Sequence, residues 1–389
     1  MIRRRTLLRT ASAVPVAAIA RRARADEQGV TKDQIRIGMH SSLTGPVAVF
    51  GLAYSRSAKL VFDQANDEGG INGRKIALTV EDDKGDPAAG VAAVTKLLDR
   101  DGSFLIYGGP FTPVALATFP RVIERERIYW SVGSATPRLT DPFHRLTFQG
   151  NETLDDQAVP VAKLVGSMKP KRIAFIRQND EYGAIAHDST AKELPKHGLK
   201  IDDEESIEPS AISASAQILR IKSSGADVII FGGTPKAADA IIREIYKNGL
   251  SSPLVSFGGG NANALFDLVT GDAPIEYYAA SALACPLDQP CTAEFRKVWK
   301  AAYPNDAPIT WAAHGYAASK MFVQGLRDAG PDLTTERLIA TFENMAPYAT
   351  PILPFPIKFS ADNHRGIHGA FFDGFKDGKH AFFGDELKS

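Results

Sequence analysis

The 389-residue chain lacks the features of a membrane protein or of a common enzyme class. No stretch reaches the roughly 18 to 20 consecutive apolar residues that cross a bilayer. The chain has no phosphate-binding loop, no HExxH zinc motif and no GxSxG nucleophile motif. Its glycine clusters at 108–109, 232–233 and 258–260 lack the GxGxxG spacing of dinucleotide-binding folds. We therefore expect no enzymatic activity and no cofactor.

Metal ligands in a recognisable pattern are also missing. The eight histidines are scattered, and His314, His364 and His368 are expected to be surface or packing residues. The acidic cluster EDDKGD at residues 81–86 misses the alternating ligand spacing of an EF-hand loop. A solvated turn after a strand is the favoured interpretation of this cluster, and no metal site is predicted.

Cysteine is scarce, with only Cys285 and Cys291 in the segment CPLDQPC. A zinc site would need two more ligands, and no other cysteine or histidine lies in this segment. In an oxidising compartment, a close pair flanked by prolines favours a small-loop disulfide. We predict this disulfide, with two free thiols as the alternative.

The first 25 residues have the composition of an export signal. Residues 3–9 (RRRTLLR) form a basic region with a twin-arginine pattern, and residues 10–20 form a short, weakly apolar run. Ala23-Arg24-Ala25 fits a small-x-small cleavage site. We predict a twin-arginine signal peptide over residues 1–25, with an ordinary Sec signal as the alternative. Either route delivers the mature chain to the periplasm.

The charge balance argues against nucleic acid as a partner. The whole chain has 45 basic and 45 acidic residues, and seven of the basic ones are leader arginines. The mature chain therefore has 38 basic residues against 45 acidic ones, a formal charge of −7. Non-specific binding to nucleic acid needs a basic surface.

Short apolar strands alternate with amphipathic helices through most of the chain. Strands are predicted at residues 35–39, 76–80, 104–107, 128–132, 172–176, 228–231 and 254–257. Helical runs separate them, and Pro87 opens one of these helices. This alternation is typical of βαβ units and of parallel sheets with helices on both faces. The units are too many for one compact sheet, so we predict two similar α/β lobes.

The pattern changes after about residue 275. Helices are predicted over residues 292–303, 310–329 and 334–345, followed by a tail rich in proline, glycine and aromatics with a short strand at 370–375. No linker rich in glycine, serine or proline separates the two lobes. This organisation fits two lobes joined by several crossovers better than two lobes arranged in series.

Small and hydroxyl-bearing residues follow several predicted strands. They form the segments TGP (44–46), GPFT (109–112), GSAT (133–136) and GGT (232–234). Ligands of open parallel sheets bind outside the carboxyl ends of the strands. Hydroxyls and free N–H groups at helix starts suit a carboxylate or another polar head. A single such residue is usually a turn or N-cap residue, but several at successive strand ends predict one binding cleft.

Three segments of the first half form a specific pattern. They are IRIGMHSSLTGPVAVFG at residues 35–51, ANDEGGINGRK at residues 65–75 and EDDKGDP at residues 81–87. This pattern resembles the periplasmic branched-chain amino acid (leucine, isoleucine and valine) binding proteins, and the likeness covers nearly the whole mature chain.

The resemblance implies a type I periplasmic binding protein fold of the α/β class. Two Rossmann-like lobes with parallel sheets would be joined by three crossovers around a ligand cleft, and a hinge would close the lobes over one ligand. The first lobe would contain residues 34–152 plus about 285–352. The second lobe would contain residues 153–284 plus about 353–389.

The resemblance also implies ligand contacts. It places the aromatic against the ligand side chain at Phe50, the carboxylate-binding hydroxyl at Thr112 and the aromatic lid of the second lobe at Tyr182. The remaining implied contacts are Gly133, Ser134, Ala135, Thr234 and Gly259.

One departure from the family pattern affects the ligand class. The family's ammonium-binding acid should follow the strand at 254–257, where this chain has Gly258-Gly259-Gly260-Asn261. We therefore predict a small solute bearing a carboxylate or carbonyl group, so that an organic acid or amide is as credible as an amino acid. Asp180 or Glu181 is the expected substitute if an acid is needed.

These features together predict a monomeric, periplasmic solute-binding component of an ABC importer. Its partners would be a small-molecule ligand and the permease subunits in the inner membrane. The alternative is a ligand-sensing protein of the same fold that reports to a regulator or receptor. An enzyme would need a catalytic pair in the cleft, and the sequence offers no candidate.

Overall fold

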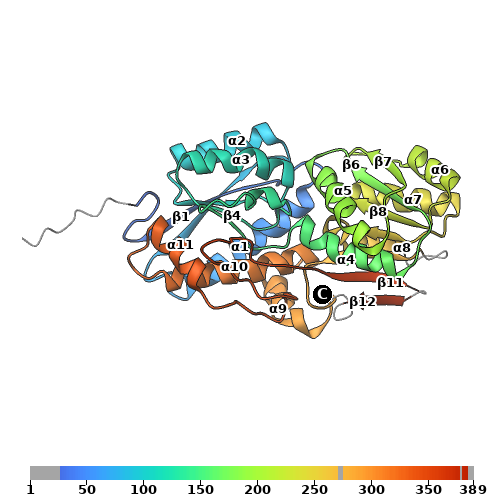
Figure 1. The fold of residues 1–389 in the computed structure, drawn as a ribbon. Coiled ribbons are helices and arrows are strands. Elements are labelled where there is room, and N and C mark those ends of the chain that lie inside the picture. Colours follow the sequence, from blue (N-terminus) through green and yellow to red (C-terminus); the bar gives the residue numbers. More distant parts are fainter. Residues whose placement is uncertain (1–26, 270–274, 377–378, 384–389) are drawn as a thin grey trace, which may run out of the picture.

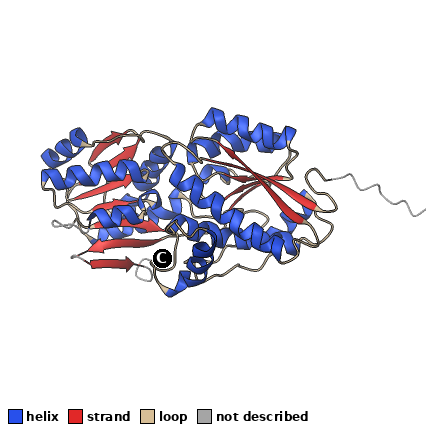
Figure 2. Cartoon of the chain, turned by 180° about the vertical axis from the view of Figure 1, so that it is seen from behind, coloured by secondary structure: helices blue, strands red, loops and turns tan. Residues whose placement is uncertain are grey.

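The structure, a computed structural model, describes residues 27–269, 275–376 and 379–383 (Figure 1). It contains two α/β lobes side by side, each built on its own sheet (Figure 2). The predicted two-lobed architecture is therefore confirmed. The predicted signal peptide over residues 1–25 lies outside the described residues. No helix in the described part of the chain is both long and apolar enough to cross a membrane.

The first lobe contains a five-stranded parallel sheet in the order β2-β1-β3-β4-β5. Its strands are β1 (Gln34–Ser41), β2 (Lys75–Asp82), β3 (Leu105–Gly108), β4 (Tyr129–Ser131) and β5 (Thr147–Gln149). Alternate residues of a strand point to opposite faces. Ile106 and Tyr129 accordingly pack in a core with α2 (Pro87–Thr95) and α3 (Thr112–Glu124). Tyr107 and Trp130 pack in the larger core with α1 (Ala48–Asp67).

Three helices from the last third of the chain complete the first lobe. They are α9 (Ala293–Ala302), α10 (Thr310–Asp328) and α11 (Thr335–Asn344), and they confirm the helices predicted there. Phe322 of α10 lies 5.8 Å from Phe62 of α1 and 5.1 Å from Tyr107 of β3, measured between ring centroids. The core of the first lobe is therefore built from both ends of the chain.

The chain returns to the second lobe later than predicted. Ile357, Phe359 and Ile367 are buried in the core of the first lobe. The Gly366 N–H donates to the Gln149 carbonyl at the end of β5, at 2.9 Å. The expected boundary at about residue 353 is therefore too early. We propose residues 27–150 plus 283–369 for the first lobe, and the other described residues for the second.

The second lobe contains a seven-stranded sheet in the order β12-β11-β10-β9-β8-β6-β7. Neighbouring strands from β10 to β7 are parallel, whereas β11 and β12 are antiparallel to their neighbours. The strands are β6 (Ile173–Gln178), β7 (Asp203–Ile207), β8 (Val228–Gly232), β9 (Leu254–Ser256), β10 (Tyr277–Ser281), β11 (Phe371–Lys376) and β12 (Lys379–Phe383). The helices are α4 (Leu154–Ser167), α5 (Glu181–Glu193), α6 (Ser215–Ser224), α7 (Pro235–Asn248) and α8 (Asn263–Val269).

The chain passes between the lobes three times, between β5 and α4, after β10 and before β11. The first passage ends in a capping box, in which the Thr153 hydroxyl accepts from the Asp156 N–H and the Asp156 carboxylate accepts from the Thr153 N–H. This box fixes the start of α4, and Asn151 and Glu152 come directly before its N-cap Thr153.

Cys285 and Cys291 are joined by a disulfide, with their Cα atoms 6.4 Å apart. Replacing both by serine is expected to lower the free energy of unfolding by at most about 2–3 kcal/mol, because a loop this short restricts the unfolded chain only modestly. Urea titration of the two proteins measures the difference. Intact-mass analysis of periplasmic protein with and without reductant checks the bond itself, and two freely alkylated thiols would contradict it.

Candidate functional site

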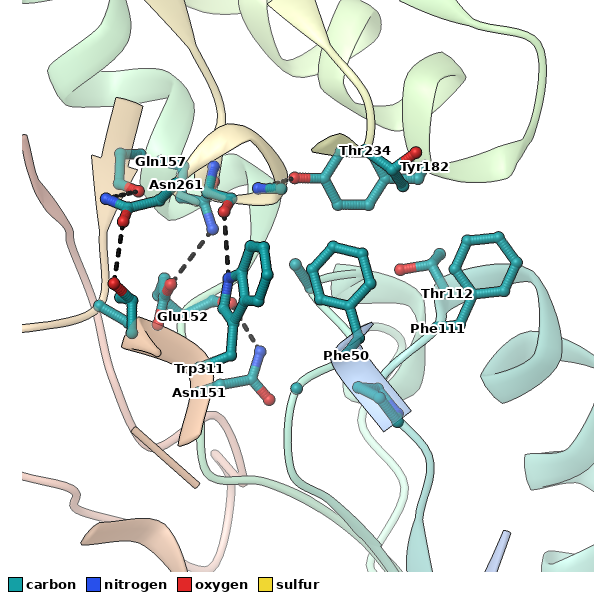
Figure 3. Close-up of a pocket in the computed structure, with 18 of the residues that line it drawn as sticks. Phe50, Phe111, Thr112, Asn151, Glu152, Gln157, Tyr182, Thr234, Asn261 and Trp311 are labelled. Atoms are coloured by element: carbon teal, nitrogen blue, oxygen red, sulfur yellow. Dashed lines mark hydrogen bonds between the residues drawn. The ribbon is translucent and has the colours of Figure 1, made fainter. Parts of the chain in front are cut away.

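A cavity lies between the two lobes at the carboxyl ends of the parallel strands (Figure 3). It encloses about 610 Å³, part of it open to solvent. The residues that line it come from both lobes and are Phe50, Tyr54, Pro110, Phe111, Thr112, Gly133, Ala135, Asn151, Glu152, Gln157, Tyr182, Thr234, Gly258, Gly259, Asn261, Ala280, Ala282, Thr310 and Trp311. A concave site lined mostly by apolar side chains with a few polar groups is typical of small-molecule binding.

Seven of the eight residues suggested by the sequence line this cavity. They are Phe50, Thr112, Gly133, Ala135, Tyr182, Thr234 and Gly259. Ser134 is fully buried behind the wall, where its hydroxyl lies 3.3 Å from the Thr112 hydroxyl. Their contacts with a ligand remain predictions, but the structure brings these residues together around one space.

Thr112 lies at the first position of α3, whose N-terminus opens on the cavity. Phe111 precedes it in an extended conformation, and Pro113 fits the first turn because proline lacks the N–H that a helix start leaves unpaired. The first-turn N–H groups and the helix dipole favour a negative group at this end. The Thr112 hydroxyl can donate to the same group, so this part of the wall can accept a carboxylate.

Aromatic side chains form the apolar walls. The rings of Phe50 and Trp311 lie with their centroids 4.2 Å apart and tilted by 49°. On the second lobe, the Tyr182 hydroxyl accepts from the Gly259 N–H at 3.0 Å, which fixes the phenol ring. These rings can cover the apolar body of a solute by area burial and stacking.

Two hydrogen bonds join the lobes directly across the cavity. The Trp311 indole N–H donates to the Gly258 carbonyl at 3.3 Å, and the Thr310 hydroxyl donates to Asn261 Oδ1 at 3.1 Å. Both donors belong to the start of α10 in the first lobe. Both acceptors belong to the short turn after β9 in the second lobe. The structure therefore has the two lobes in contact over the cavity.

Gly259, in the glycine run after β9, has no space for a Cβ atom. A Cβ atom on Gly259 would lie 2.3 Å from the Gly233 carbonyl oxygen, a backbone contact that cannot relax easily. No acidic side chain can therefore occupy position 259 without moving the neighbouring loop.

The acid that lines the cavity is Glu152, a residue that no sequence pattern singles out. Burial, followed by the nearby charge of Asp156, raises the pKa of Glu152 to about 8. The expected substitutes lie elsewhere: Asp180 caps α5 by accepting from the Gly183 N–H at 2.9 Å, and Glu181 is half-exposed and paired with Arg138 at 3.0 Å. The only sequence signal for Glu152 is its place between a strand end and the Thr153 N-cap.

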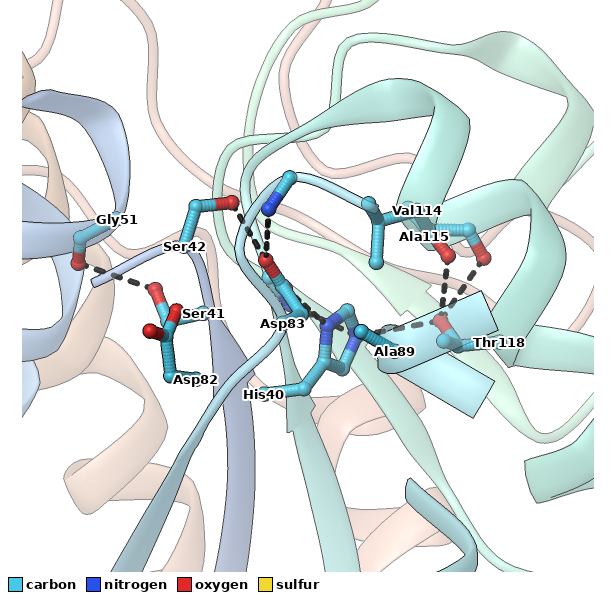
Figure 4. A network of polar contacts seen from close by, with 12 residues as sticks. His40, Ser41, Ser42, Gly51, Asp82, Asp83, Ala89, Val114, Ala115 and Thr118 are labelled. Atoms are coloured by element: carbon cyan, nitrogen blue, oxygen red, sulfur yellow. Dashed lines mark hydrogen bonds and ion pairs between the residues drawn. The ribbon is translucent and has the colours of Figure 1, made fainter. Parts of the chain in front are cut away.

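A buried polar network lies at the carboxyl ends of β1, β2 and β3 in the first lobe (Figure 4). Asp83 accepts from the Ser42 hydroxyl at 2.6 Å, and its other oxygen lies 2.9 Å from His40 Nδ1. His40 Nε2 accepts from the Gly109 N–H at 3.1 Å, so the ring proton lies on Nδ1. Gly109 begins the loop that leads to Thr112, and the network therefore holds one wall of the cavity.

This network corrects one expectation and does not form a catalytic site. Asp83 is only 1% exposed, so the acidic cluster at residues 81–86 is not simply a solvated turn. The Ser42 hydroxyl bonds to Asp83 and not to His40, and none of the three side chains lines the cavity. Among the described residues, no group of three or more histidines, cysteines or acids could hold a metal ion.

Comparisons with known proteins agree with this geometry. A family model described as "Periplasmic binding protein" matches residues 34–379. Leu/Ile/Val-binding protein homolog 1 of Brucella suis is 29% identical over 297 residues, which cover 76% of this chain and 79% of that protein.

Solved structures show the same architecture. A periplasmic binding protein type 1 from Bordetella pertussis matches with a TM-score of 0.79 and 26% identity, covering 90% of this chain and 99% of that one. A solute-binding protein of an ABC transporter from Rhodopseudomonas palustris, in complex with 3,4-dihydroxybenzoic acid, matches with a TM-score of 0.78 and 19% identity. That match covers 91% of this chain and 97% of that one.

Proposed function

This chain belongs to the periplasmic binding protein family, and we propose that it is the solute-binding component of an ABC importer in the periplasm. It captures an amino acid, or a related small organic acid or amide, in the cleft between its lobes and delivers it to the membrane permease. The observation that carries this proposal is the cavity whose walls come from both lobes. Such a cavity forms only when the lobes approach each other, which couples occupancy to the shape that a permease recognises.

The composition of the wall supports a solute with an apolar body and a polar head. Phe50, Trp311 and Tyr182 offer ring surfaces to the body. Thr112 and the start of α3 offer donors to a carboxylate or carbonyl oxygen. Relatives fit this range, because the Brucella suis protein is named for leucine, isoleucine and valine, and the Rhodopseudomonas palustris protein holds an aromatic acid.

Tryptophan fluorescence tests the proposal. The chain has three tryptophans, and of these only Trp311 lines the cavity. Adding a bound solute is expected to change the emission of the wild-type chain. Trp311→Phe should abolish that change while calorimetry still detects binding. A screen of amino acids, short amides and aromatic acids in which nothing binds would contradict the proposal.

The leader gives a separate prediction about export. Replacing both Arg4 and Arg5 by lysine is expected to leave uncleaved precursor in the cytoplasm, because the twin-arginine pathway requires the arginine pair. Fractionation followed by immunoblotting measures the distribution, and a Sec-dependent reporter in the same cells is the control. Normal export of the double variant would contradict the twin-arginine route but not periplasmic residence.

A further inference from the structure

Asn151 and Glu152 bring two unsatisfied acceptors to the cavity wall. Asn151 Oδ1 and Glu152 Oε2 are buried, and within the described structure neither has a hydrogen-bond partner. The other polar side-chain atoms of both residues are engaged. Asn151 Nδ2 donates to the carbonyls of Ser134 and Glu152 at 3.0 and 2.8 Å, and Glu152 Oε1 accepts from Gln157 Nε2 at 3.2 Å. Buried polar atoms are normally paired, so when Glu152 is ionised these two oxygens call for donors from a ligand.

The wall offers no positive charge of its own. None of the residues lining the cavity is a lysine, arginine or histidine, and Glu152 is the only acid among them. A buried carboxylate needs a charged partner, because an unpaired buried charge is strongly unfavourable. The partner of an ionised Glu152 must therefore come from the solute.

We infer that Asn151 and Glu152 form a subsite for a protonated amine, so that the natural solute carries an ammonium group. The inference rests on the proposed solute-binding function and narrows its ligand class. The acid lies in the crossover before α4 and not after β9, where a Cβ atom on Gly259 would lie 2.3 Å from the Gly233 carbonyl oxygen. With a carboxylate at Thr112 and an amine at Glu152, the cavity fits an amino acid.

The surroundings of Glu152 make binding proton-linked. The nearby charge of Asp156 from α4 raises the pKa of Glu152, and the charge of Glu152 in turn raises the pKa of Tyr54 from α1 and of Tyr182 from α5. Behind Tyr54, burial lowers the pKa of His314 to about 4, so this imidazole is neutral. Beyond Asp156 lie the Arg365 guanidinium and the His368 ring, each 3.6 Å from the Asp156 carboxylate.

The sign of the proton change distinguishes an amine from an acid. With a pKa of about 8, the Glu152 carboxyl of the empty site is mostly protonated near neutral pH. A bound ammonium stabilises the ionised form, so binding releases close to one proton and affinity rises toward pH 8. A solute that binds only through a carboxylate keeps Glu152 protonated, so binding releases no proton and affinity falls above pH 8.

Selective capture from a bacterial small-molecule extract tests the inference on a mixture of natural compounds. Wild-type chain, Glu152→Gln and Glu181→Gln are incubated with the extract, washed and denatured, and released compounds are identified by mass spectrometry. Wild type and Glu181→Gln are expected to retain amine-bearing compounds, and Glu152→Gln to retain them at least about tenfold less, the effect of losing a charged hydrogen bond. Retention of compounds without an amine, or equal retention by Glu152→Gln, would overturn the inference. If no variant retains any compound, solute binding itself is contradicted.

Calorimetry in buffers of different ionisation enthalpy measures the proton change with defined probes. L-leucine is compared with 4-methylpentanoate, and L-phenylalanine with 3-phenylpropanoate, because each pair differs only in the amine. Tighter binding of the amine-bearing member, with release of close to one proton, supports the inference. An acid that binds as tightly as its amino partner overturns it and leaves the proposed function standing. This measurement uses the wild-type chain, so it holds even if Glu152→Gln does not fold.

Discussion

Replacing Trp311 by alanine is expected to weaken solute binding by about 100-fold or more. A buried indole covers about 150–250 Å² of apolar surface, and if a solute meets half of it, the lost contact is about 2–3 kcal/mol at ~25 cal/mol per Å². The substitution also removes the hydrogen bond to the Gly258 carbonyl that joins the lobes. The chain should stay folded, because Tyr316 and Phe322 still anchor α10 in the core.

Trp311→Phe is the matched control. It keeps a ring beside Phe50 but lacks the indole N–H, so calorimetry should show a loss of less than about tenfold, the value of one neutral hydrogen bond. The two variants together separate the ring surface from the bond between the lobes. If Trp311→Ala bound within threefold of wild type, the aromatic wall would not contact the solute.

Removing the carboxylate of Asp83 is expected to have the largest effect on stability. Asp83→Ala should lower the free energy of unfolding by about 3–5 kcal/mol, because it leaves buried polar partners without an acceptor. Those partners are the His40 ring, the Ser42 hydroxyl and the Gly85 N–H, which lie at 2.9, 2.6 and 2.9 Å from the carboxylate. Urea titration followed by circular dichroism measures the loss.

Two further variants give reference values for the loss of unfolding free energy in Asp83→Ala. Asp83→Asn keeps the shape and one acceptor oxygen, so its loss should be smaller than that of Asp83→Ala. Asp63→Asn removes an exposed acid whose partner is Lys59, one turn earlier on α1, and exposed pairs of this kind contribute only about 0.3–0.5 kcal/mol. Equal losses for Asp83→Ala and Asp63→Asn would show that burial of the network contributes nothing.

The parts of the fold that the sequence predicts are those with strong apolar runs. Strands such as β6 and β8 are buried on both faces, and their continuous apolar residues mark them clearly. In contrast, β7 has the sequence DEESI because it lies at the sheet edge, where charged side chains reach solvent. The three residues of β5 are too few to show a period. Local sequence cannot reveal strands that depend on their neighbours for stability.

The residues of the candidate site also fall into a group that the sequence predicts and a group that it does not. Thr112 and Thr234 follow strongly predicted strands, and parallel topology places such positions at one edge of a sheet. Glu152 follows the weak strand β5, and Trp311 lies on a helix some 160 positions later in the chain. Glu152 and Trp311 lie at the same cavity because of the path of the chain between the lobes. The local sequence does not reveal that path. The boundary predicted at about residue 353 was too early for the same reason, because no local sequence signal marks where the chain crosses between the lobes.

The first lobe is discontinuous in sequence, and this constrains the order in which the two lobes can fold during synthesis. Its β-strands are translated first, but Phe322, Phe342 and Phe359 of its core follow only near the end of synthesis. The central strands and helices of the second lobe form one continuous stretch, which can collapse while the rest of the chain is still in the ribosome. We therefore expect the part of the chain that emerges first to complete its fold last, with its apolar strands exposed until translation is nearly complete.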